Sequence, residues 1–427
     1  MSLNREGFGV ELVCVSCQQR YDADSLRTRC DCGGLLDLIL PESGAVDVSV
    51  YNKRLRAWRG PDSSGVWRYR EFLPAFDEQQ IVSRPEGNTN LYHAPEIARD
   101  VGVAELWLKH EGENPTGSFK DRGMTVATSH AVKVGATMVA CASTGNTSAS
   151  VASYAAFAGL PAVVFVPDGK ISAAKLGQTV AYGARIIQIR GDFDAAMRLV
   201  QDASRELGIY LLNSINPYRI EGQKTILIEL LHQLDWTIPD WIVLPGGNLG
   251  NTAAVGKALA ELRDRNAINK SPRVAVIQAE GASPFYEAFR SSFRSFEPMD
   301  ADTVASAIRI GNPVSYEKAR RTIERTDGVV EAVTDTEIMD AKALVDRSGI
   351  GCEPASAATL AGLRKLVRTG VISPAARVAG ILTGHVMKDA EAVMTYHLGN
   401  GTSPGRFANQ PVVIDPEMSQ LREVLQR

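Results

Sequence analysis

Short apolar segments alternate with longer amphipathic ones through most of the chain. The apolar segments are rich in β-branched residues and are predicted strands: 106–109, 138–142, 162–166, 185–189, 210–212, 241–244, 274–278 and 378–382. The segments between them have a helical pattern and are predicted helices: 121–134, 147–158, 173–182, 193–207, 222–234, 252–263 and 355–367. Glycines follow four of these helices, where a left-handed C-cap favours glycine: Gly135, Gly159, Gly183 and Gly208. The alternation predicts an α/β fold whose parallel sheets are covered by helices on both faces.

The two ends of the chain depart from this pattern. Residues 1–40 contain two close pairs of cysteines around a polar, hairpin-like stretch. Residues 41–80 favour an extended lead-in with one short helix near 52–58. Glycine, serine and proline follow Gly399, and a short helix is predicted from Pro416, so 401–427 should form a peripheral tail.

Composition narrows the class of protein. The length of 427 residues allows two or three domains, and 44% hydrophobic with 22% charged residues is typical of a soluble globular protein. A formal charge of −3 gives no general attraction to nucleic acid or anionic membranes. Residues 1–7 are polar, unlike a signal peptide, and no apolar run approaches the roughly 20 residues of a membrane-spanning helix. We expect a cytoplasmic, enzyme-sized protein with no nucleic-acid or membrane partner.

Lys120 is the first candidate for chemistry. It lies between a Pro-Thr-Gly turn and the predicted helix 121–134, within the run 113–123. Catalytic side chains concentrate in fixed loops at such junctions. An exposed lysine in the first turn of a helix would explain the residue equally well when it is considered alone.

Four further loops follow predicted strands, where ligands bind in parallel sheets. The hydroxyl-rich run 143–148 suits an anion such as a carboxylate, and the glycine-rich run 245–251 suits a phosphate at a helix N-terminus. The loop 213–219 brings an arginine beside amide and hydroxyl groups, and 383–385 adds a threonine and a histidine that is expected to be structural. A plain N-cap, a tight turn and a solvated arginine are the ordinary alternatives for the first three.

Four of the six cysteines form a candidate zinc site: Cys14, Cys17, Cys30 and Cys32. Only one residue separates the second pair, which is shorter than the usual spacing, so metal-free thiols remain an open alternative. Cys141 and Cys352 stand alone in apolar surroundings and are expected in the core.

Together, these loops resemble the pyridoxal-phosphate enzymes of fold type II, the tryptophan synthase β type, and among them the threonine synthase family. The resemblance covers about residues 84–390 and rests on 114–123, 143–148 and 246–251. The runs 213–225, 311–315 and 351–357 resemble threonine synthases rather than their relatives. One departure is Asn90, where the family usually has proline; this should alter the stiffness of the loop more than its chemistry.

The resemblance implies two open, parallel-rich sheets flanked by helices, beside the four-cysteine element. We expect that element at 1–40, a large cofactor domain at 41–121 and 213–400, a small mobile domain at 122–212 and the tail at 401–427. A homodimer is the implied assembly.

The resemblance also assigns roles to residues. Lys120 would hold the pyridoxal phosphate as a Schiff base and then serve as a mobile base. Asn146 would bond the phenolic oxygen of the cofactor, and Thr383 its ring nitrogen. The phosphate of the cofactor would lie on a single loop: Gly247, Asn248, Leu249, Gly250 and Asn251. The implied substrate is O-phospho-L-homoserine. Its carboxylate would bind to Ser143, Thr144 and Thr147, and its phosphate to Asn213, Ser214 and Arg219.

The implied reaction removes the Cα proton and a Cβ proton, expels phosphate from Cγ and adds water at Cβ, giving L-threonine. Other enzymes of the same fold are the nearest alternatives: a serine/threonine dehydratase, or a β-replacement enzyme related to cysteine or cysteate synthase. Arg219 favours a phosphorylated substrate and disfavours a dehydratase. A zinc-ribbon module that binds nucleic acid is the alternative from another class, and the acidic balance of the chain argues against it.

Overall fold

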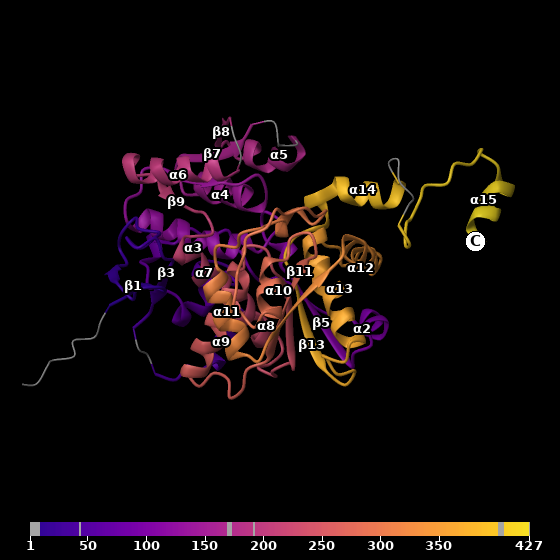
Figure 1. Cartoon of the computed structure of the whole chain (residues 1–427), viewed down its shortest axis with the longest axis horizontal. Coiled ribbons are helices and arrows are strands. Elements are labelled where there is room, and N and C mark those ends of the chain that lie inside the picture. Colours follow the sequence, from indigo (N-terminus) through magenta and orange to yellow (C-terminus); the bar gives the residue numbers. More distant parts are fainter. Residues whose placement is uncertain (1–8, 42–43, 169–172, 191–192, 400–404, 427) are drawn as a thin grey trace, which may run out of the picture.

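The computed structural model describes residues 9–41, 44–168, 173–190, 193–399 and 405–426. The run 1–7, predicted not to be a signal peptide, lies outside the described residues, as does the beginning of the predicted tail. Three sheets form the framework, with the larger two stacked one above the other in Figure 1.

A six-stranded sheet forms the centre of the larger layer. Its strands are β4 (Leu91–His93), β5 (Glu105–His110), β10 (Trp241–Pro245), β11 (Arg273–Ala279), β12 (Val329–Val333) and β13 (Arg377–Leu382). Their spatial order is β12-β11-β10-β13-β5-β4, and every pair is parallel except β4 with β5. Alternate side chains of β10 enter two different cores, Val243 in one and Ile242 in the other, as the two-residue period of a strand requires. Both faces of this sheet are therefore buried.

Helices cover both faces. One core includes side chains of α2 (Pro95–Val101), α12 (Asp335–Arg347) and α13 (Pro354–Arg368). The other includes side chains of α1 (Ser49–Arg54), α8 (Thr225–Gln233), α9 (Gly250–Asp264), α10 (Pro284–Arg290) and α11 (Tyr316–Arg325). This arrangement confirms the predicted α/β layers.

A four-stranded parallel sheet forms the smaller layer, in the order β8-β7-β6-β9. Its strands are β6 (Val139–Ala142), β7 (Ala162–Pro167), β8 (Arg185–Ile189) and β9 (Tyr210–Leu211). The helices of this layer are α3 (Lys120–Lys133), α4 (Asn146–Phe157), α5 (Ala173–Ala181) and α6 (Phe193–Leu207). Cys141 on β6 is fully buried, as is Cys352, which confirms the prediction that both are core residues.

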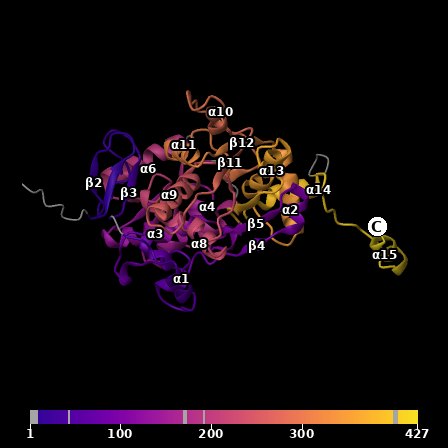
Figure 2. The same cartoon turned by 90° about the horizontal axis from the view of Figure 1, so that it is seen from below.

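The four-cysteine element is a small antiparallel sheet of order β2-β1-β3. Its strands are β1 (Glu11–Cys14), β2 (Arg20–Asp22) and β3 (Leu36–Ile39). Leu12 and Leu38 share one hydrophobic core with Val126 of α3, so the element is attached to the smaller layer. Figure 2 shows it at one end of the molecule, opposite the tail.

Several predicted segments were wrong in extent. The helix expected near 52–58 lies at 49–54, and short 3-10 helices occupy much of the lead-in: Pro61–Ser63, Trp67–Phe72 and Glu78–Gln80. The helix expected at 222–234 is two helices, α7 (Pro217–Gln223) and α8, so Arg219 lies in a helix and not in a loop. Asn216 caps α7 by accepting a hydrogen bond from the amide of Tyr218, and Pro217 occupies its first position, which is a start signal that the sequence contained.

No helix or strand was predicted in the region 280–350, although the structure places α10, α11, β12 and α12 there. Helix α12 begins with a capping box, in which Thr334 and Glu337 bond each other's backbone amides. That pattern is readable in a sequence and could have identified the helix. Three more 3-10 helices complete the framework: Glu111–Glu113, Ser306–Ile308 and Val386–Asp389. Helix α14 (Ala390–Leu398) precedes the predicted tail, which contains α15 (Met418–Leu425), and α15 extends away from the body in both views.

Helices α3 and α7 cross at two glycines. A Cβ atom added to Gly222 would lie 1.8 Å from the carbonyl oxygen of Arg122 and 2.8 Å from Cα of Gly123. A Cβ atom added to Gly123 would lie 2.7 Å from the carbonyl oxygen of Arg219. The backbones can therefore approach only because neither position carries a side chain. Lys120 and Arg219 each precede one of these glycines by three residues, which places them on the same faces of their helices as the crossing.

Replacing Gly222 by alanine should destabilise the fold, because the new methyl group would overlap backbone atoms that have little freedom to move. Overpacking of this kind costs about 1–3 kcal/mol in the free energy of unfolding, measured by urea denaturation. Gly177→Ala is the matched control, since Gly177 lies within helix α5 and has nothing within 4 Å of its Cβ position. Equal losses of stability in the two variants would contradict the close crossing.

Candidate active site

Lys120 is the first residue of α3, and the loop before it is fixed from two sides. The amide of Phe119 donates to the carbonyl oxygen of Thr383 at 3.0 Å, and Ser118 forms an antiparallel bridge with Gly384. These contacts join the end of β13 to the start of α3. Lys120 is thereby held next to the loop that carries Thr383.

The pKa of Lys120 is lowered to about 7. Burial is the largest cause, the positive charge of Arg219 adds to it, and the negative charge of Glu353 opposes it. A lysine with such a pKa is substantially a neutral amine near pH 7, the form that attacks a carbonyl or accepts a proton.

Arg219 is a buried cation, 2% exposed. Its Nη1 donates to the carbonyl oxygen of Leu212 at 3.2 Å, while its Nε has no hydrogen-bond partner. No carboxylate pairs with it in the part of the chain that the structure describes, and burial lowers its pKa to about 10. Because an unpaired buried charge is costly, the arrangement suits an anionic ligand.

The glycine-rich loop leads from β10 into α9. Leu249 has a left-handed backbone, with φ 62°, and a Cβ atom on Gly247 would lie 3.0 Å from Cα of Ile308. Gly250 begins α9, and both polar side-chain atoms of Asn251 are buried without a partner. A backbone cradle, a helix N-terminus and an unsatisfied amide together fit the phosphate of the predicted cofactor.

Asn248 connects this loop to the one after β9. Its Nδ2 donates to Ser214 Oγ at 3.1 Å, and its Oδ1 accepts from the amide of Val314 at 2.9 Å. Asn213 is placed differently: its side chain makes two bonds of 3.0 Å, to the amide and to the carbonyl of Ala142. Asn213 therefore joins β6 to the loop that holds Ser214, and its predicted contact with the substrate stays a prediction.

The hydroxyl-rich loop leads from β6 into α4. Gly145 is the N-cap and supplies no side chain to the first turn of the helix. Ser143 Oγ accepts from the amide of Gly145 at 3.3 Å, and Thr144 and Thr147 are partly exposed. The hydroxyl groups therefore do not serve as the helix cap, and the first-turn amides are open to a ligand.

Glu353 connects residues from both layers. Its Oε2 accepts from Asn146 Nδ2 at 2.9 Å, and its Oε1 lies 3.0 Å from Thr383 Oγ1. The side chain is 1% exposed and packs over Gly384, where an added Cβ atom would lie 2.4 Å from its carboxyl carbon. Burial raises the pKa of Glu353. Asn146 and Thr383, the two predicted contacts of the cofactor ring, thus lie at one carboxyl group.

Glu353 and Asp121 lie at the site and belong to sequence motifs, but no role was predicted for either. Glu353 lies in the run 351–357, and the signal would have been a lone acid directly before a helix of small residues. Asp121 accepts from the amide and the hydroxyl of Thr116, both at 2.7 Å, and from Ser150 Oγ at 2.6 Å, so it fixes the turn before Lys120 against α4. His385 caps a 3-10 helix, which agrees with its predicted structural role.

Hydrogen bonds and electrostatic contacts link the segments that carry Lys120, Asn146, Arg219 and Thr383. Asn248 and Ser214 are joined to each other. Ser143, Thr144 and Thr147 form the predicted carboxylate site. Among the described residues, none of these three side chains makes a hydrogen bond to the other predicted site residues. The sequence had placed these residues at separate strand ends, and their proximity is a property of the fold.

The four cysteines of the N-terminal element form a second cluster. Their sulfur atoms all lie within 4.8 Å of one another, with Cys14 and Cys32 3.5 Å apart and Cys17 and Cys30 3.4 Å apart. In a tetrahedral zinc site with bonds of about 2.3 Å, sulfurs would be about 3.8 Å apart. The four thiols therefore fit a zinc ion.

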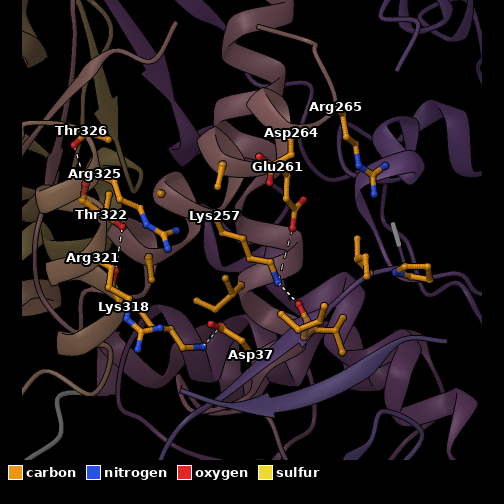
Figure 3. Close-up of a pocket in the computed structure, with 18 residues that line it drawn as sticks. Asp37, Lys257, Glu261, Asp264, Arg265, Lys318, Arg321, Thr322, Arg325 and Thr326 are labelled. Atoms are coloured by element: carbon orange, nitrogen blue, oxygen red, sulfur yellow. Dashed lines mark hydrogen bonds and ion pairs between the residues drawn. The ribbon is translucent and has the colours of Figure 1, made fainter. Parts of the chain in front are cut away.

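A cavity of about 690 Å³ lies between β3 and the helices α9 and α11 (Figure 3). Lys318 donates to Asp37 at 2.5 Å across it, and Lys257 donates to the carbonyl oxygen of Leu38 at 2.5 Å. These bonds attach the four-cysteine element to the larger layer. None of the residues predicted for the site lines this cavity.

Comparisons with known proteins identify the family. The family model described as pyridoxal-phosphate dependent enzyme matches residues 82–384. The chain is 44% identical to a threonine synthase of Methanocaldococcus jannaschii, over 96% of this chain and 98% of the relative. It is also 44% identical to a threonine synthase of Methanosarcina acetivorans, over 97% of this chain and 98% of the relative. A maize serine racemase, 24% identical, has a similar fold with a TM-score of 0.63, over 79% of this chain and 99% of that one.

In the cofactor-free protein, Lys120 should react with an amine-acylating reagent more readily than exposed lysines do near neutral pH. Because only the neutral amine reacts, labelling should rise as the pH increases through about 7, the lowered pKa of Lys120, and level off above it. An ordinary lysine has a pKa of about 10.4, so exposed lysines of the same digest should still be increasing at about pH 9. Mass spectrometry of the labelled peptides measures the extent of labelling of Lys120 and of the exposed lysines at each pH. Parallel curves would show that the environment does not lower the pKa of Lys120.

Proposed function

The chain belongs to the family of pyridoxal-phosphate dependent enzymes, and we propose that it acts on O-phospho-L-homoserine, converting it with water into L-threonine and phosphate. Its activity is that of a threonine synthase, a pyridoxal-phosphate dependent lyase of threonine biosynthesis. The identity of the substrate and the roles of individual residues are the proposed parts.

The unpaired guanidinium of Arg219 is the observation that carries the choice of substrate. It is buried, positively charged and electrostatically coupled to Lys120, so an anionic group of the substrate would neutralise it close to the reacting carbons. A phosphate accepts two parallel hydrogen bonds from a guanidinium. Ser214 and Asn248 would complete this site, and a dehydratase acting on unphosphorylated serine or threonine would leave Arg219 without a counter-ion.

The residues present fit pyridoxal phosphate. Lys120 would hold its carbonyl carbon, the loop 247–251 its phosphate, Asn146 its phenolic oxygen and Thr383 its ring nitrogen. When bound, the cofactor supplies an electron-accepting ring that stabilises negative charge on the substrate. The orphaned amide of Asn251 and the cradle at Gly247 support the position of the phosphate.

The chain's own contribution is binding and proton transfer. The carboxylate of the substrate would lie at the start of α4, on the hydroxyl groups of Ser143, Thr144 and Thr147 with the first-turn amides. Lys120, as a neutral amine, would take the proton from Cα and move protons at Cβ and Cγ from one side of the substrate. Its lowered pKa allows it to accept and release protons near pH 7.

Three expectations about organisation stay predictions. All strands of the smaller sheet fall within the proposed mobile domain, 122–212, while those of the six-stranded sheet fall within 41–121 and 213–400. This supports a small domain that closes over the substrate and excludes water. The homodimer and the cytoplasmic location follow from the family resemblance. Among the described residues, no helix has the length and apolar character needed to cross a membrane.

The purified enzyme with its cofactor should release phosphate from O-phospho-L-homoserine and form an equal amount of threonine. Phosphate is measured colorimetrically and threonine by chromatography. Serine and threonine should give no keto acid, which separates the proposal from a dehydratase. A coloured protein that releases no phosphate would overturn the substrate but not the cofactor.

Arg219→Ala should raise the KM for O-phospho-L-homoserine about 30- to 150-fold, since a hydrogen-bonded charge contributes about 2–3 kcal/mol. The absorbance of the bound cofactor should change little, because Arg219 is assigned to the substrate. Arg325→Ala, at an exposed arginine of α11, is the control and should leave the KM unchanged. Equal effects of Arg219→Ala on cofactor absorbance and substrate affinity would refute the assignment.

We also propose that the four cysteines bind a structural zinc ion through their thiolates, supported by their mutual distances. Metal analysis should find about one zinc per chain, as expected for a four-cysteine site. Replacing Cys17 and Cys32 by serine should abolish the zinc and lower the melting temperature, whereas Cys352→Ala should retain the metal. Wild-type protein that contains no zinc after growth with zinc would contradict the proposal.

A further inference from the structure

Ser356 determines the direction of the hydrogen bonds at Thr383. Its Oγ accepts from the amide of Thr383 at 2.7 Å and from the amide of Gly384 at 3.0 Å. A hydroxyl oxygen has two lone pairs, and both are then occupied. The Ser356 hydroxyl must therefore donate in its third contact, to Thr383 Oγ1 at 2.9 Å.

Thr383 has a single hydroxyl proton to give. If Glu353 is ionised, its Oε1, 3.0 Å away, takes that proton in a hydrogen bond, and Thr383 has no donor left for another group. If Glu353 carries a proton on Oε1, it donates to Thr383 Oγ1 instead. Thr383 then accepts two hydrogen bonds, and its own proton is free to point toward an acceptor outside this chain of groups.

The surroundings of Glu353 favour the protonated form. Its Oε2 accepts from Asn146, which suits a carbonyl oxygen as well as a carboxylate oxygen. No ion pair forms with it among the described residues, and Lys388 donates to Gln178 of α5. Burial raises the pKa of Glu353 and the charge of Asp389 adds to this, while the bonds from Asn146 and Thr383 and the charge of Lys388 oppose it. Lys120 also faces Glu353, but its own pKa is lowered to about 7, so its charge is only partial near neutral pH.

We propose that Glu353 is a neutral carboxylic acid that turns the hydroxyl proton of Thr383 toward the ring nitrogen of the cofactor. The proposal deepens the proposed function and rests on the assignment of Thr383 to that nitrogen. The nitrogen then receives a hydrogen bond and no proton, since no acid in this chain of groups faces it directly. Glu353 is a positioning residue: it acts through Thr383 and, by its second oxygen, holds Asn146 for the phenolic oxygen.

The order Ser356, Thr383, Glu353 explains why three polar groups are buried together without a counter-ion. The Ser356 hydroxyl and the Glu353 carboxyl both donate to Thr383 Oγ1, the Thr383 proton is left for an acceptor outside these groups, and each oxygen accepts no more bonds than its lone pairs allow. The absence of a side chain at Gly384 provides the room for the carboxyl group. The carboxyl group, in turn, donates from Oε1 to Thr383 and accepts at Oε2 from Asn146.

A matched pair of variants tests this assignment. Glu353→Gln keeps a neutral side chain of the same shape, with an N–H to donate to Thr383 and a carbonyl to accept from Asn146. Glu353→Leu removes both bonds. The leucine variant should bind pyridoxal phosphate about tenfold or more weakly and shift the absorbance of the bound cofactor, because two hydrogen bonds contribute about 1–3 kcal/mol. The glutamine variant should restore the wild-type absorbance and most of the cofactor affinity.

If the Glu353→Gln variant has the same absorbance as the Glu353→Leu variant, a carboxylate is required at this position. That result would overturn the proposal. Infrared spectroscopy of the unsubstituted protein provides a measurement that does not depend on how the variants fold. At about pH 8, exposed glutamates with reference pKa near 4.3 are ionised. A protonated-carboxyl band that shifts when glutamate side chains carry ¹³C is the expected result. Its absence at this pH would also overturn the proposal.

These readouts separate the inference from the proposed function. Absorbance, cofactor affinity and the infrared band are all recorded without substrate. A protein that shows them but releases no phosphate from O-phospho-L-homoserine would retain the role of Glu353 and lose only the substrate. Phosphate release without the infrared band would retain the substrate and overturn the role of Glu353.

Discussion

The close crossing of α3 and α7 is the constraint on which the site depends. Gly123 and Gly222 let the two backbones approach to a distance that any Cβ atom would prevent. Lys120 and Arg219 precede these glycines by one helical turn each, so the crossing brings the two cations together. Burial, and to a smaller extent repulsion by Arg219, then lowers the pKa of Lys120, and a reactive amine results from backbone packing.

Two buried arginines beside this crossing illustrate how structural and functional charges differ. Arg122 is fully buried and bonds Glu111 at 2.6 Å and Glu229 at 2.7 Å, and Glu229 also pairs with Lys109 at 2.6 Å. Its charge is compensated within the protein, as is normal for a buried ion. Arg219 is equally buried but has no such compensation among the described residues. The first arginine stabilises the layers, and the second is available to a ligand.

The fold alone would not have identified the activity. A serine racemase shares it with a TM-score of 0.63 at 24% identity, and one fold can support several reactions. In the function proposed above, the choice among them depends on Arg219 of α7 and its neighbours. The chain is similar along nearly its whole length to threonine synthases of Methanocaldococcus jannaschii and Methanosarcina acetivorans, which agrees with the same activity.

The sequence by itself determined the layers and most of the loops of the site. Periodicity located the strands and helices because side-chain burial repeats every two residues in a strand and about every 3.6 in a helix. The glycine-rich loop at 246–251 and the run around Lys120 were recognisable because backbone conformation demands particular residues there. No helix or strand was predicted in 280–350, although Thr334 and Glu337 form a capping box there, and the start of α7 at Asn216 and Pro217 was missed. Only the tertiary structure decided which loops meet, that Asn213 bonds the backbone of Ala142, and that Glu353 lies between Asn146 and Thr383. These contacts join residues far apart in the chain, and their distances follow from how the layers pack, which no short segment of sequence contains.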